Sequence, residues 1–343
     1  MKLLPVILLI IFLNHSCAQE SGMSNEINAK PYKVLKGHKY KVQNAFFRPN
    51  GKFIVSHGWD NTVRTWDVKT FTEIRTFKGH TDQVWCATVS PDNKLIASGS
   101  LDRTFIIWDV ETGEKLQQVQ ISPYNIIMKG LVPELDHEFP NSVYGLSFSP
   151  NGKELAIATA DKLVRIWDLE NDMFTDTLDG QHTTNWMKCS YSPDGKYLVS
   201  RSYASRREDG MNVIWETETY SQVFRIALAG KILFIDHNEV GIYAGNNMMN
   251  YYNLSDGSLA FSKPFPDYKG SLELSPDRKY MVSCNEDSYI ILRNIKMQEV
   301  VWTYKNKKLE IHNAHFSPDG KYLIAGRPEA DILIWKMKSL IKR

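Results

Sequence analysis

A five-residue phrase recurs along this chain and constrains its fold more than any other feature. Each copy has Pro at its second place, Asp or Asn at its third and Lys at its last. The copies lie at residues 48–52, 90–94, 149–153, 192–196, 275–279 and 317–321. Pro presets the backbone angle φ, and Asp or Asn bonds its own backbone, so the phrase predicts a tight turn. Because apolar, β-rich runs flank the copies, each is expected to join two antiparallel strands.

A second landmark follows each turn at a nearly constant distance. In the first unit it is Trp66, 17 residues after Pro49, and the same step recurs in four further units. The seven landmarks are Trp66, Trp108, Trp167, Trp215, Tyr252, Arg293 and Trp335. Constant spacing holds one strand register, since a slip of one residue would turn every side chain to the wrong face. Most landmarks are roughly 40 residues apart, the period of a four-stranded propeller blade, so seven blades are predicted.

Paired motifs at matched spacing give the chain a family resemblance. Trp-Asp pairs lie at 66–67, 108–109 and 167–168, and Gly-His pairs lie at 37–38 and 79–80. With the turns, these pairs make the chain resemble the WD-repeat (WD40) propeller family across residues 32 to 338. The resemblance implies an all-β fold, a seven-bladed β-propeller of four-stranded antiparallel blades within residues 32–343. Blades five to seven lack both pairs, so their number rests on the turn spacing.

The resemblance also implies a chain of hydrogen bonds inside single blades. The matching residues are His38, Ser56, Asp60 and Trp66 in the first unit and His80, Ser98, Asp102 and Trp108 in the second. Such polar groups become buried between blades and must be satisfied there. We assign them a structural role rather than general-base catalysis, because their spacing follows a repeat and not one site.

The two ends of the repeat region complement each other. Residues 339–343, which follow the third strand expected near 331–338, are too few for a fourth strand. Residues 32–36 precede the first Gly-His pair and have no blade of their own. In the resembled family such an N-terminal strand completes the last blade, and closing the ring removes two exposed strand edges. We expect the same closure here.

The first residues have the character of an export signal. Lys2 precedes an apolar run at 3–13, which is short for a transmembrane helix, and small residues follow at 16–18. We assign residues 1–18 to a signal peptide and 19–31 to a linker. Either a signal peptidase cleaves after Ala18, or Cys17 is lipidated, because the Ser-Cys pair there resembles a bacterial lipoprotein box. Both alternatives predict an exported protein of bacterial type, periplasmic, anchored in the cell envelope or secreted.

Charge and motifs narrow the possible chemistry. The formal net charge of +2 lacks the basic footprint of nucleic-acid binders, and membrane contact is expected only through a lipid on Cys17. The sequence contains no GxSxG elbow, P-loop, HExxH or CxxC motif, so no catalytic residue, metal or cofactor is expected. Glu273 and His315 take equivalent places in the innermost strands of blades six and seven. We expect them to bond between blades, with acid–base chemistry or metal binding as the alternative.

Residues inserted into the regular repeat indicate where a partner binds. The step between blades two and three contains 17 extra residues, within 121–140, and blade four contains five extra residues, within 201–208. In the resembled family both loops emerge on the rim that carries the Gly-His pairs. The candidate partner-binding residues on that rim are Trp59, Tyr124, Arg201, Arg206 and Arg207. Aromatic residues beside arginines are common anchors of protein interfaces, so a protein partner is predicted.

These features favour a non-enzymatic protein-binding scaffold in the cell envelope or periplasm. The alternative is a propeller enzyme, a hydrolase or lyase acting at the central channel. A cytosolic scaffold is a third hypothesis, against which Lys2 and the apolar run argue. An enzyme should gather titratable groups or a metal at one channel mouth, whereas a scaffold should expose an aromatic and arginine surface.

Overall fold

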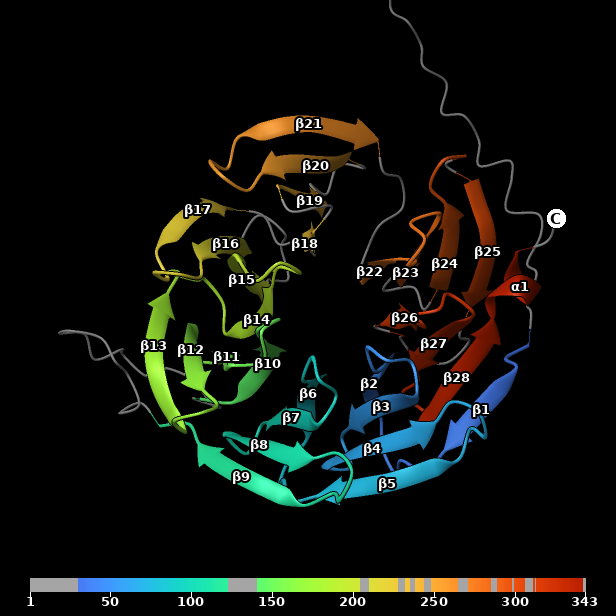
Figure 1. Ribbon diagram of the computed structural model, residues 1–343. Coiled ribbons are helices and arrows are strands. Elements are labelled where there is room, and N and C mark those ends of the chain that lie inside the picture. Colours follow the sequence, from blue (N-terminus) through green and yellow to red (C-terminus); the bar gives the residue numbers. More distant parts are fainter. Residues whose placement is uncertain are drawn as a thin grey trace, which may run out of the picture.

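Seven four-stranded antiparallel sheets form a closed ring, so the predicted seven-bladed β-propeller is confirmed (Figure 1). The computed structural model describes residues 30–122, 141–203, 210–227, 232–234, 238–243, 248–264, 271–284, 289–297, 299–305, 311 and 313–341. The expected signal peptide, with Cys17, lies outside the described residues. Within the described part of the chain, no helix combines the length and apolar character needed to cross a membrane.

Each blade runs outward from a strand beside the central axis, and every strand of the first three blades has six residues except the outermost strand of blade three, which has seven. Blade one contains β2 (Val42–Phe47), β3 (Phe53–Gly58), β4 (Thr62–Asp67) and β5 (Glu73–Lys78). Blade two contains β6 (Val84–Val89), β7 (Leu95–Ser100), β8 (Thr104–Asp109) and β9 (Lys115–Gln120). Blade three contains β10 (Val143–Phe148), β11 (Glu154–Thr159), β12 (Leu163–Asp168) and β13 (Met173–Asp179).

Blade four keeps an innermost strand of six residues, whereas the innermost strands of blades five to seven have three residues each. Blade four contains β14 (Trp186–Tyr191), β15 (Tyr197–Tyr203), β16 (Met211–Glu216) and β17 (Gln222–Ile226). Blade five contains β18 (Ile232–Phe234), β19 (Glu239–Tyr243), β20 (Met248–Asn253) and β21 (Leu259–Pro264). Blade six contains β22 (Leu272–Leu274), β23 (Tyr280–Cys284), β24 (Tyr289–Asn294) and β25 (Glu299–Lys305). Blade seven contains β26 (Ala314–Phe316), β27 (Tyr322–Gly326), β28 (Asp331–Lys336) and, as its outermost strand, β1 (Lys33–Lys36).

The recurring phrase forms the turn between the two inner strands of six blades, as predicted. In blade two, Ser90 Oγ donates a hydrogen bond to Asp92 Oδ1 at 2.6 Å and accepts one from the Leu95 amide at 2.9 Å. Gly51 and Asn93 take positive φ values of 66° and 64°, which these residue types tolerate. The turns therefore fix the hairpin register locally, before any contact between blades.

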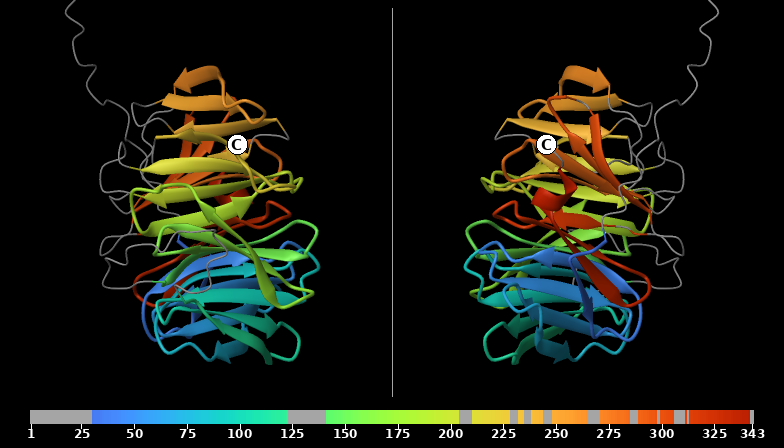
Figure 2. Two further views of the ribbon diagram at one scale, coloured as in Figure 1. Left: turned by 90° about the vertical axis from the view of Figure 1, so that its left-hand side faces the viewer. Right: turned by 90° about the vertical axis from the view of Figure 1, so that its right-hand side faces the viewer.

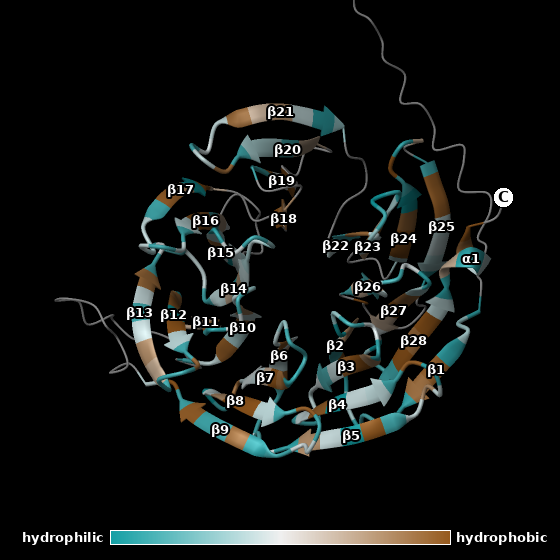
Figure 3. Cartoon of the chain, viewed as in Figure 1, coloured by the Kyte–Doolittle hydropathy of each residue, from teal (hydrophilic) through white to brown (hydrophobic). Residues whose placement is uncertain are grey.

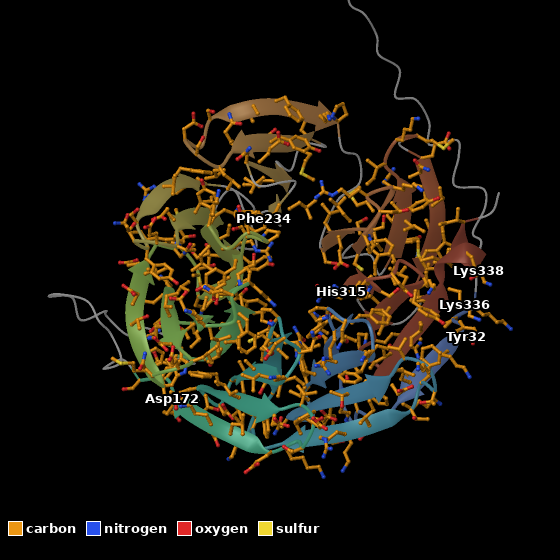
Figure 4. The ribbon with its side chains drawn as sticks, viewed as in Figure 1. Tyr32, Asp172, Phe234, His315, Lys336 and Lys338 are labelled. Carbon is orange, nitrogen blue, oxygen red and sulfur yellow. The ribbon has the colours of Figure 1, made fainter. Side chains whose placement is uncertain are left out.

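The ring is closed by the N-terminal strand, which confirms the predicted closure. β1 pairs with β28 in antiparallel register, and the Tyr32 amide donates to the Ile334 carbonyl at 2.7 Å. Leu35 is buried against blades seven and one. Tyr32 and Lys336 lie together at the outer edge of the closing blade (Figure 4), with the ammonium group 3.6 Å from the ring centroid. The chain then ends in a short helix, α1 (Met337–Leu340), instead of a further strand.

The hydrophobic core lies between neighbouring blades. β8, β12 and β28 carry apolar stretches, which are brown in Figure 3. In β8 and β12 five of six residues are buried. Phe105 of blade two packs edge-on against Trp167 of blade three, with ring centroids 5.3 Å apart. Neighbouring blades cover both faces of β8 and β12, and strands covered on both faces are apolar at most of their positions.

The strands cross the ring from one rim to the other (Figure 2). Antiparallel connection places the recurring turns on one rim, which we call the turn rim. The loops with the Gly-His pairs, the β3–β4 turn and the β15–β16 connection lie on the other rim, which we call the Gly-His rim. The strand ends that flank both predicted insertions lie on the Gly-His rim, and the insertions themselves, residues 123–140 and 204–209, lie outside the described residues.

Candidate functional site

The repeat histidines of blades one and two are held in complete hydrogen-bond chains. In blade two, His80 Nδ1 lies 2.8 Å from Asp102 Oδ2, and its Nε2 lies 2.8 Å from Ser98 Oγ. Trp108 Nε1 donates to the same Ser98 hydroxyl at 2.8 Å. Burial alone would raise the pKa of Asp102, but the hydrogen bond and charge of His80 outweigh it and hold that pKa at about 2.

Blade one repeats this geometry with the expected residues. His38 Nδ1 lies 2.9 Å from Asp60 Oδ1, and its Nε2 lies 2.8 Å from Ser56 Oγ. Trp66 Nε1 donates to Ser56 Oγ at 2.9 Å. Every polar atom of both imidazole rings is thus engaged inside a blade. Such groups stabilise the fold and leave no ring nitrogen for chemistry.

In blade three a buried arginine–aspartate ion pair takes the place of the histidine and its hydrogen bonds. Ile157 stands at the serine place of β11, and Trp167 Nε1 is buried without a hydrogen-bond partner. The buried Arg165 instead binds Asp161, with 2.5 Å between Nη2 and Oδ2, and donates to Thr159 Oγ1 at 2.6 Å. A buried charge needs a partner. This ion pair restrains the turn between the second and third strands of its blade, as the histidine chains of His38 and His80 do in blades one and two.

Glu273 and His315 do bond between blades, as expected. His315 Nδ1 lies 2.5 Å from Glu273 Oε2 of β22, and His315 Nε2 lies 3.0 Å from Asn44 Oδ1 of β2. Glu273 Oε1 also accepts the Phe316 amide at 3.0 Å. His315 faces the central axis (Figure 4) and connects blades six, seven and one beside a cavity of about 340 Å³. Both ring nitrogens face oxygen atoms of the protein, which favours a bracing role at the ring closure.

Four aromatic side chains form a connected surface on the Gly-His rim. We call Trp59, Trp85, Tyr144 and Trp186 the aromatic rim cluster. Trp85 lies at its centre, with its ring centroid 6.5 Å from the Trp59 ring and 5.4 Å from each of the other two. Trp186 also stacks on Tyr144 at 6.1 Å. The cluster crosses blades one to four, and Trp186 and Trp59 expose 53% and 36% of their surface.

Cationic side chains border this cluster. Lys41 Nζ lies 4.8 Å from the centroid of a Trp59 ring, and Trp59 Nε1 donates to Gln43 Oε1 at 3.1 Å. Arg201 lies 4.3 Å from the centroid of Tyr203, to whose hydroxyl it also donates. Cations over aromatic faces gain from the negative face of the ring, more so when partly desolvated. The rim therefore presents aromatic surface and positive charge together.

The sequence placed the five extra residues of blade four within 201–208. Arg201 itself lies within β15, which continues to Tyr203 before the connection begins. The strand is longer because Arg201 and Tyr203 still pair with Lys188 and Trp186 of β14. Trp59 occupies the β3–β4 turn on the expected rim. The other candidates, Tyr124, Arg206 and Arg207, lie outside the described residues and stay predictions.

Sequence reasoning missed three members of the cluster. The missed residues and the turn prolines that follow them are Trp85 with Pro91, Tyr144 with Pro150, and Trp186 with Pro193. Each innermost strand runs from the Gly-His rim to the turn rim, so a residue six or seven places before that proline lies at the Gly-His rim. This constant offset was the signal that could have found them.

Comparison with known proteins agrees with this architecture. Three segments of the chain match the WD domain, G-beta repeat family. They cover residues 29–67, 71–109 and 132–168, and each ends on a Trp-Asp pair. The first segment includes β1, which belongs to blade seven, and the second includes β5, which belongs to blade one. A WD repeat of the sequence is thus offset by one strand from a blade, and this offset is what lets β1 close the ring.

The curated proteins that this chain resembles are distant relatives. A chicken (Gallus gallus) serine-threonine kinase receptor-associated protein is 23% identical over 57% of this chain and 55% of that protein. Mouse (Mus musculus) apoptotic protease-activating factor 1 is 25% identical over 85% of this chain and 23% of that protein. A Schistosoma mansoni WD repeat-containing protein, SL1-17, is 24% identical over 45% of this chain and 51% of that protein. The chain matches at most about half the length of these relatives.

Proposed function

We propose that this chain is a non-enzymatic protein-binding scaffold that holds its partner on the Gly-His rim. The aromatic rim cluster carries the proposal. Trp186 and Trp59 are large, half-exposed rings that rest on a partly buried support, which is the character of interface anchors. Aromatic packing across blades one to four orders these rings before a partner arrives, so little side-chain entropy is lost on binding.

The similarity to WD-repeat proteins supports the same proposal. WD-repeat propellers are generally scaffolds for protein interaction, and the chicken relative is named for its association with a kinase receptor. Under this proposal the partner of the present chain is a protein met after export, in the periplasm or at the cell envelope. The N-terminal residues Lys2 and 3–13 motivate that location.

Substitutions on the two rims test the binding surface. The full chain, immobilised and incubated with an envelope extract of its native host, should capture a reproducible protein. Trp186→Ala and Trp59→Ala should each weaken capture by roughly 1–4 kcal/mol in binding free energy, with little change in melting temperature. Phe261→Ala on β21, an aromatic of similar exposure, and Lys52→Ala in a turn-rim turn are the matched controls.

The outcomes separate the two rims. If the controls lose capture while the tryptophan variants keep it, the binding surface is elsewhere. A second candidate function, an enzyme acting at the channel, rests on Glu273 and His315 beside the 340 Å³ cavity. It would replace the scaffold if no rim variant affected capture and His315→Gln abolished a hydrolytic or lyase activity of the native protein.

A further inference from the structure

The aromatic rim cluster is built from side chains whose polar atoms are mainly hydrogen-bond donors. Trp59 Nε1 donates to Gln43 Oε1, so that pair is satisfied. Among the residues that the structure describes, the indole N–H groups of Trp85 and Trp186 and the hydroxyl of Tyr144 have no hydrogen-bond partner. An indole nitrogen donates and does not accept, so the cluster is rich in donors and poor in acceptors.

The hydroxyl of Tyr144 is the most informative of these groups. Tyr144 is only 7% exposed, and burial raises the pKa of its hydroxyl, which therefore stays protonated at neutral pH. A buried tyrosine normally directs its hydroxyl to a hydrogen-bond partner, because an unpaired polar group out of water is costly. Tyr144 lies at the rim end of β10, so a ligand seated on the rim can bring an acceptor to it.

The strand ladder is irregular where it presents these rings. Register shifts occur at Trp85, where β6 pairs with β7, and at Tyr144, where β10 pairs with β11. Such bulges bend a strand, re-aim a side chain and recur beside binding sites. The innermost strands β6, β10 and β14 follow one another around the ring (Figure 1), so Trp85, Tyr144 and Trp186 form one continuous surface.

The four rings form two nearly parallel pairs that meet almost at right angles. The planes of Trp59 and Trp85 differ by 29°, and those of Tyr144 and Trp186 by 20°. Trp85 meets Tyr144 at 83° and Trp186 at 80°. The two exposed rings, Trp59 and Trp186, belong to the outer two of the four blades. Flat apolar surface is therefore offered at two points, with the hydroxyl of Tyr144 in the same set of contacts.

A proline-rich segment has the complementary chemistry. Proline lacks a backbone N–H, and the polyproline II helix has no internal hydrogen bonds, so its carbonyl oxygens are free acceptors while its donors are few. Its pyrrolidine rings pack on aromatic faces, as they do in peptide-binding domains lined with aromatic residues. Residues three apart lie on one face of this helix, about 9 Å from one another. That spacing is comparable to the reach from Trp59 to Trp186 across Trp85, whose ring centroid lies 6.5 Å from the first and 5.4 Å from the second.

We propose that the partner presents a proline-rich segment in the polyproline II conformation to the aromatic rim cluster. Prolines three residues apart cover Trp59 and Trp186, and a carbonyl oxygen between them accepts a hydrogen bond from the Tyr144 hydroxyl. A segment of ordinary composition would bring one N–H per residue to a surface with few acceptors, and those donors would lose water without replacement. This inference rests on the proposed scaffold function and names the chemistry of its partner.

Matched peptide pools test the preference for proline. The probes are short fluorescent peptides with blocked ends and random, uncharged flanks around a central Pro-x-x-Pro or Ala-x-x-Ala core, titrated with the full chain by fluorescence anisotropy. The Pro-x-x-Pro pool should bind about tenfold more tightly, because its helix is ordered before binding. Added salt should leave the difference unchanged, since neither core is charged. Equal affinity for the two pools would overturn the proposal.

A soluble chitin oligosaccharide is the third probe, because sugar rings also stack on aromatic faces. The proposal expects it to bind far more weakly than the Pro-x-x-Pro pool. If the sugar binds, loses its affinity in Trp186→Ala, and the two peptide pools bind alike, the cluster takes a glycan and the proline-rich partner is wrong.

A single hydroxyl locates the hydrogen bond. Tyr144→Phe should weaken binding of the Pro-x-x-Pro pool about fivefold, the worth of one hydrogen bond. Its melting temperature should not fall, because the hydroxyl bonds to no residue that the structure describes. Tyr32→Phe, at an exposed tyrosine on the outer edge of blade seven, is the control and should behave as wild type. Wild-type affinity in Tyr144→Phe, or a lower melting temperature, contradicts the role assigned to this hydroxyl.

A further variant separates this inference from the proposed function. Trp186→Ala should reduce the affinity for the Pro-x-x-Pro pool at least about tenfold and weaken capture of the envelope partner with it. If the two pools bind wild type alike while Trp186→Ala still loses capture, the rim surface stands and the proline-rich partner falls. If Trp186→Ala retains both capture and the preference for proline, the cluster binds neither, and the proposed function falls with the inference.

Discussion

Single residues decide which side-chain bonds restrain the turn between the second and third strands of a blade. Where a Gly-His pair and a serine are both present, His80 and Ser98 join Asp102 and Trp108 in one chain of bonds. In blade three isoleucine replaces the serine, and the indole N–H of Trp167 has no hydrogen-bond partner. Arg165 restrains the β11–β12 turn there instead. One residue type thus changes which polar atoms are satisfied, while the strand register stays the same.

We predict that His80→Ala destabilises the fold without acting on binding directly. The substitution removes the histidine bond from Asp102 and from Ser98, which keep their bonds to Thr104 and to Trp108, and losing such buried bonds costs about 1–3 kcal/mol. The free energy of unfolding, measured by urea titration, should fall by that amount. Lys115→Ala on the exposed strand β9 is the control and should change it by under about 0.5 kcal/mol. A His80→Ala protein as stable as wild type that no longer captures its partner would give this histidine a functional role.

We predict that stability falls as pH falls from about 6.5 toward 4. Burial lowers the pKa of His57 to about 3 and that of His182 to about 4, below the usual value of 6.5. The unfolded chain therefore binds more protons in this range, and each histidine removes up to about 1.4 kcal/mol per pH unit. Their contribution is complete above pH 6.5 and lost as pH approaches the folded values.

A variant assigns this pH dependence. Urea titrations at several pH values should show a smaller slope of unfolding free energy against pH for His57→Asn than for wild type. Asp102, with a pKa of about 2, adds its own loss only below about pH 4 and so does not obscure this window. An unchanged slope in His57→Asn would mean that His57 is protonated in the folded protein.

Among the elements, β1 has a role out of proportion to its four residues. Among the strands that the structure describes, it is the only one that joins a blade formed by the other end of the chain. Its Leu35 is buried in the interface of blades seven and one, and Tyr32 contacts Phe71 and Tyr322 edge-on and stacked. The strand therefore connects the first and last blades through hydrogen bonds and apolar packing.

We predict that deleting residues 32–36 together with everything before them opens the ring. The deletion exposes the edge of β28 and the buried faces beside Leu35, so the protein should melt at a lower temperature and aggregate. Deleting only the residues before Ala29 is the control and should leave melting unchanged. Thermal melting with size-exclusion chromatography reads both out. Identical behaviour of the two truncations would refute closure by β1.

At the scale of the whole molecule, the two rims differ in kind. The turn rim carries repeated tight turns whose hydrogen bonds are local, as at Ser90 and Asp92. The Gly-His rim carries the aromatic rim cluster, whose members come from four blades. The variation between blades is therefore concentrated on the Gly-His rim, and loops on a rigid scaffold are where we propose that the partner binds.

We predict that the N-terminal segment is an export signal and that the mature protein therefore lacks roughly its first 16 to 18 residues. Mass spectrometry of protein from the native host measures the N-terminus. Gln19 at the N-terminus indicates a signal peptidase, and a diacyl-thioether mass on Cys17 indicates lipidation. An intact Met1 on a protein recovered from the cytosol would refute export.

The sequence by itself determined the repeated hairpins, the number of blades and the strand that closes the ring. Those features depend on interactions close in the chain, such as a turn proline with its aspartate, and on a spacing that keeps register. The hydrogen-bond chains of His38 and His80 could also be predicted from the sequence, because all their partners belong to the same blade.

The tertiary structure alone decided which residues of different blades meet. Trp85, Tyr144 and Trp186 are far apart in the chain, and His315 and Asn44 are separated by 271 residues. The curvature of the ring brings the innermost strands together around one axis, and no local pattern encodes that angle.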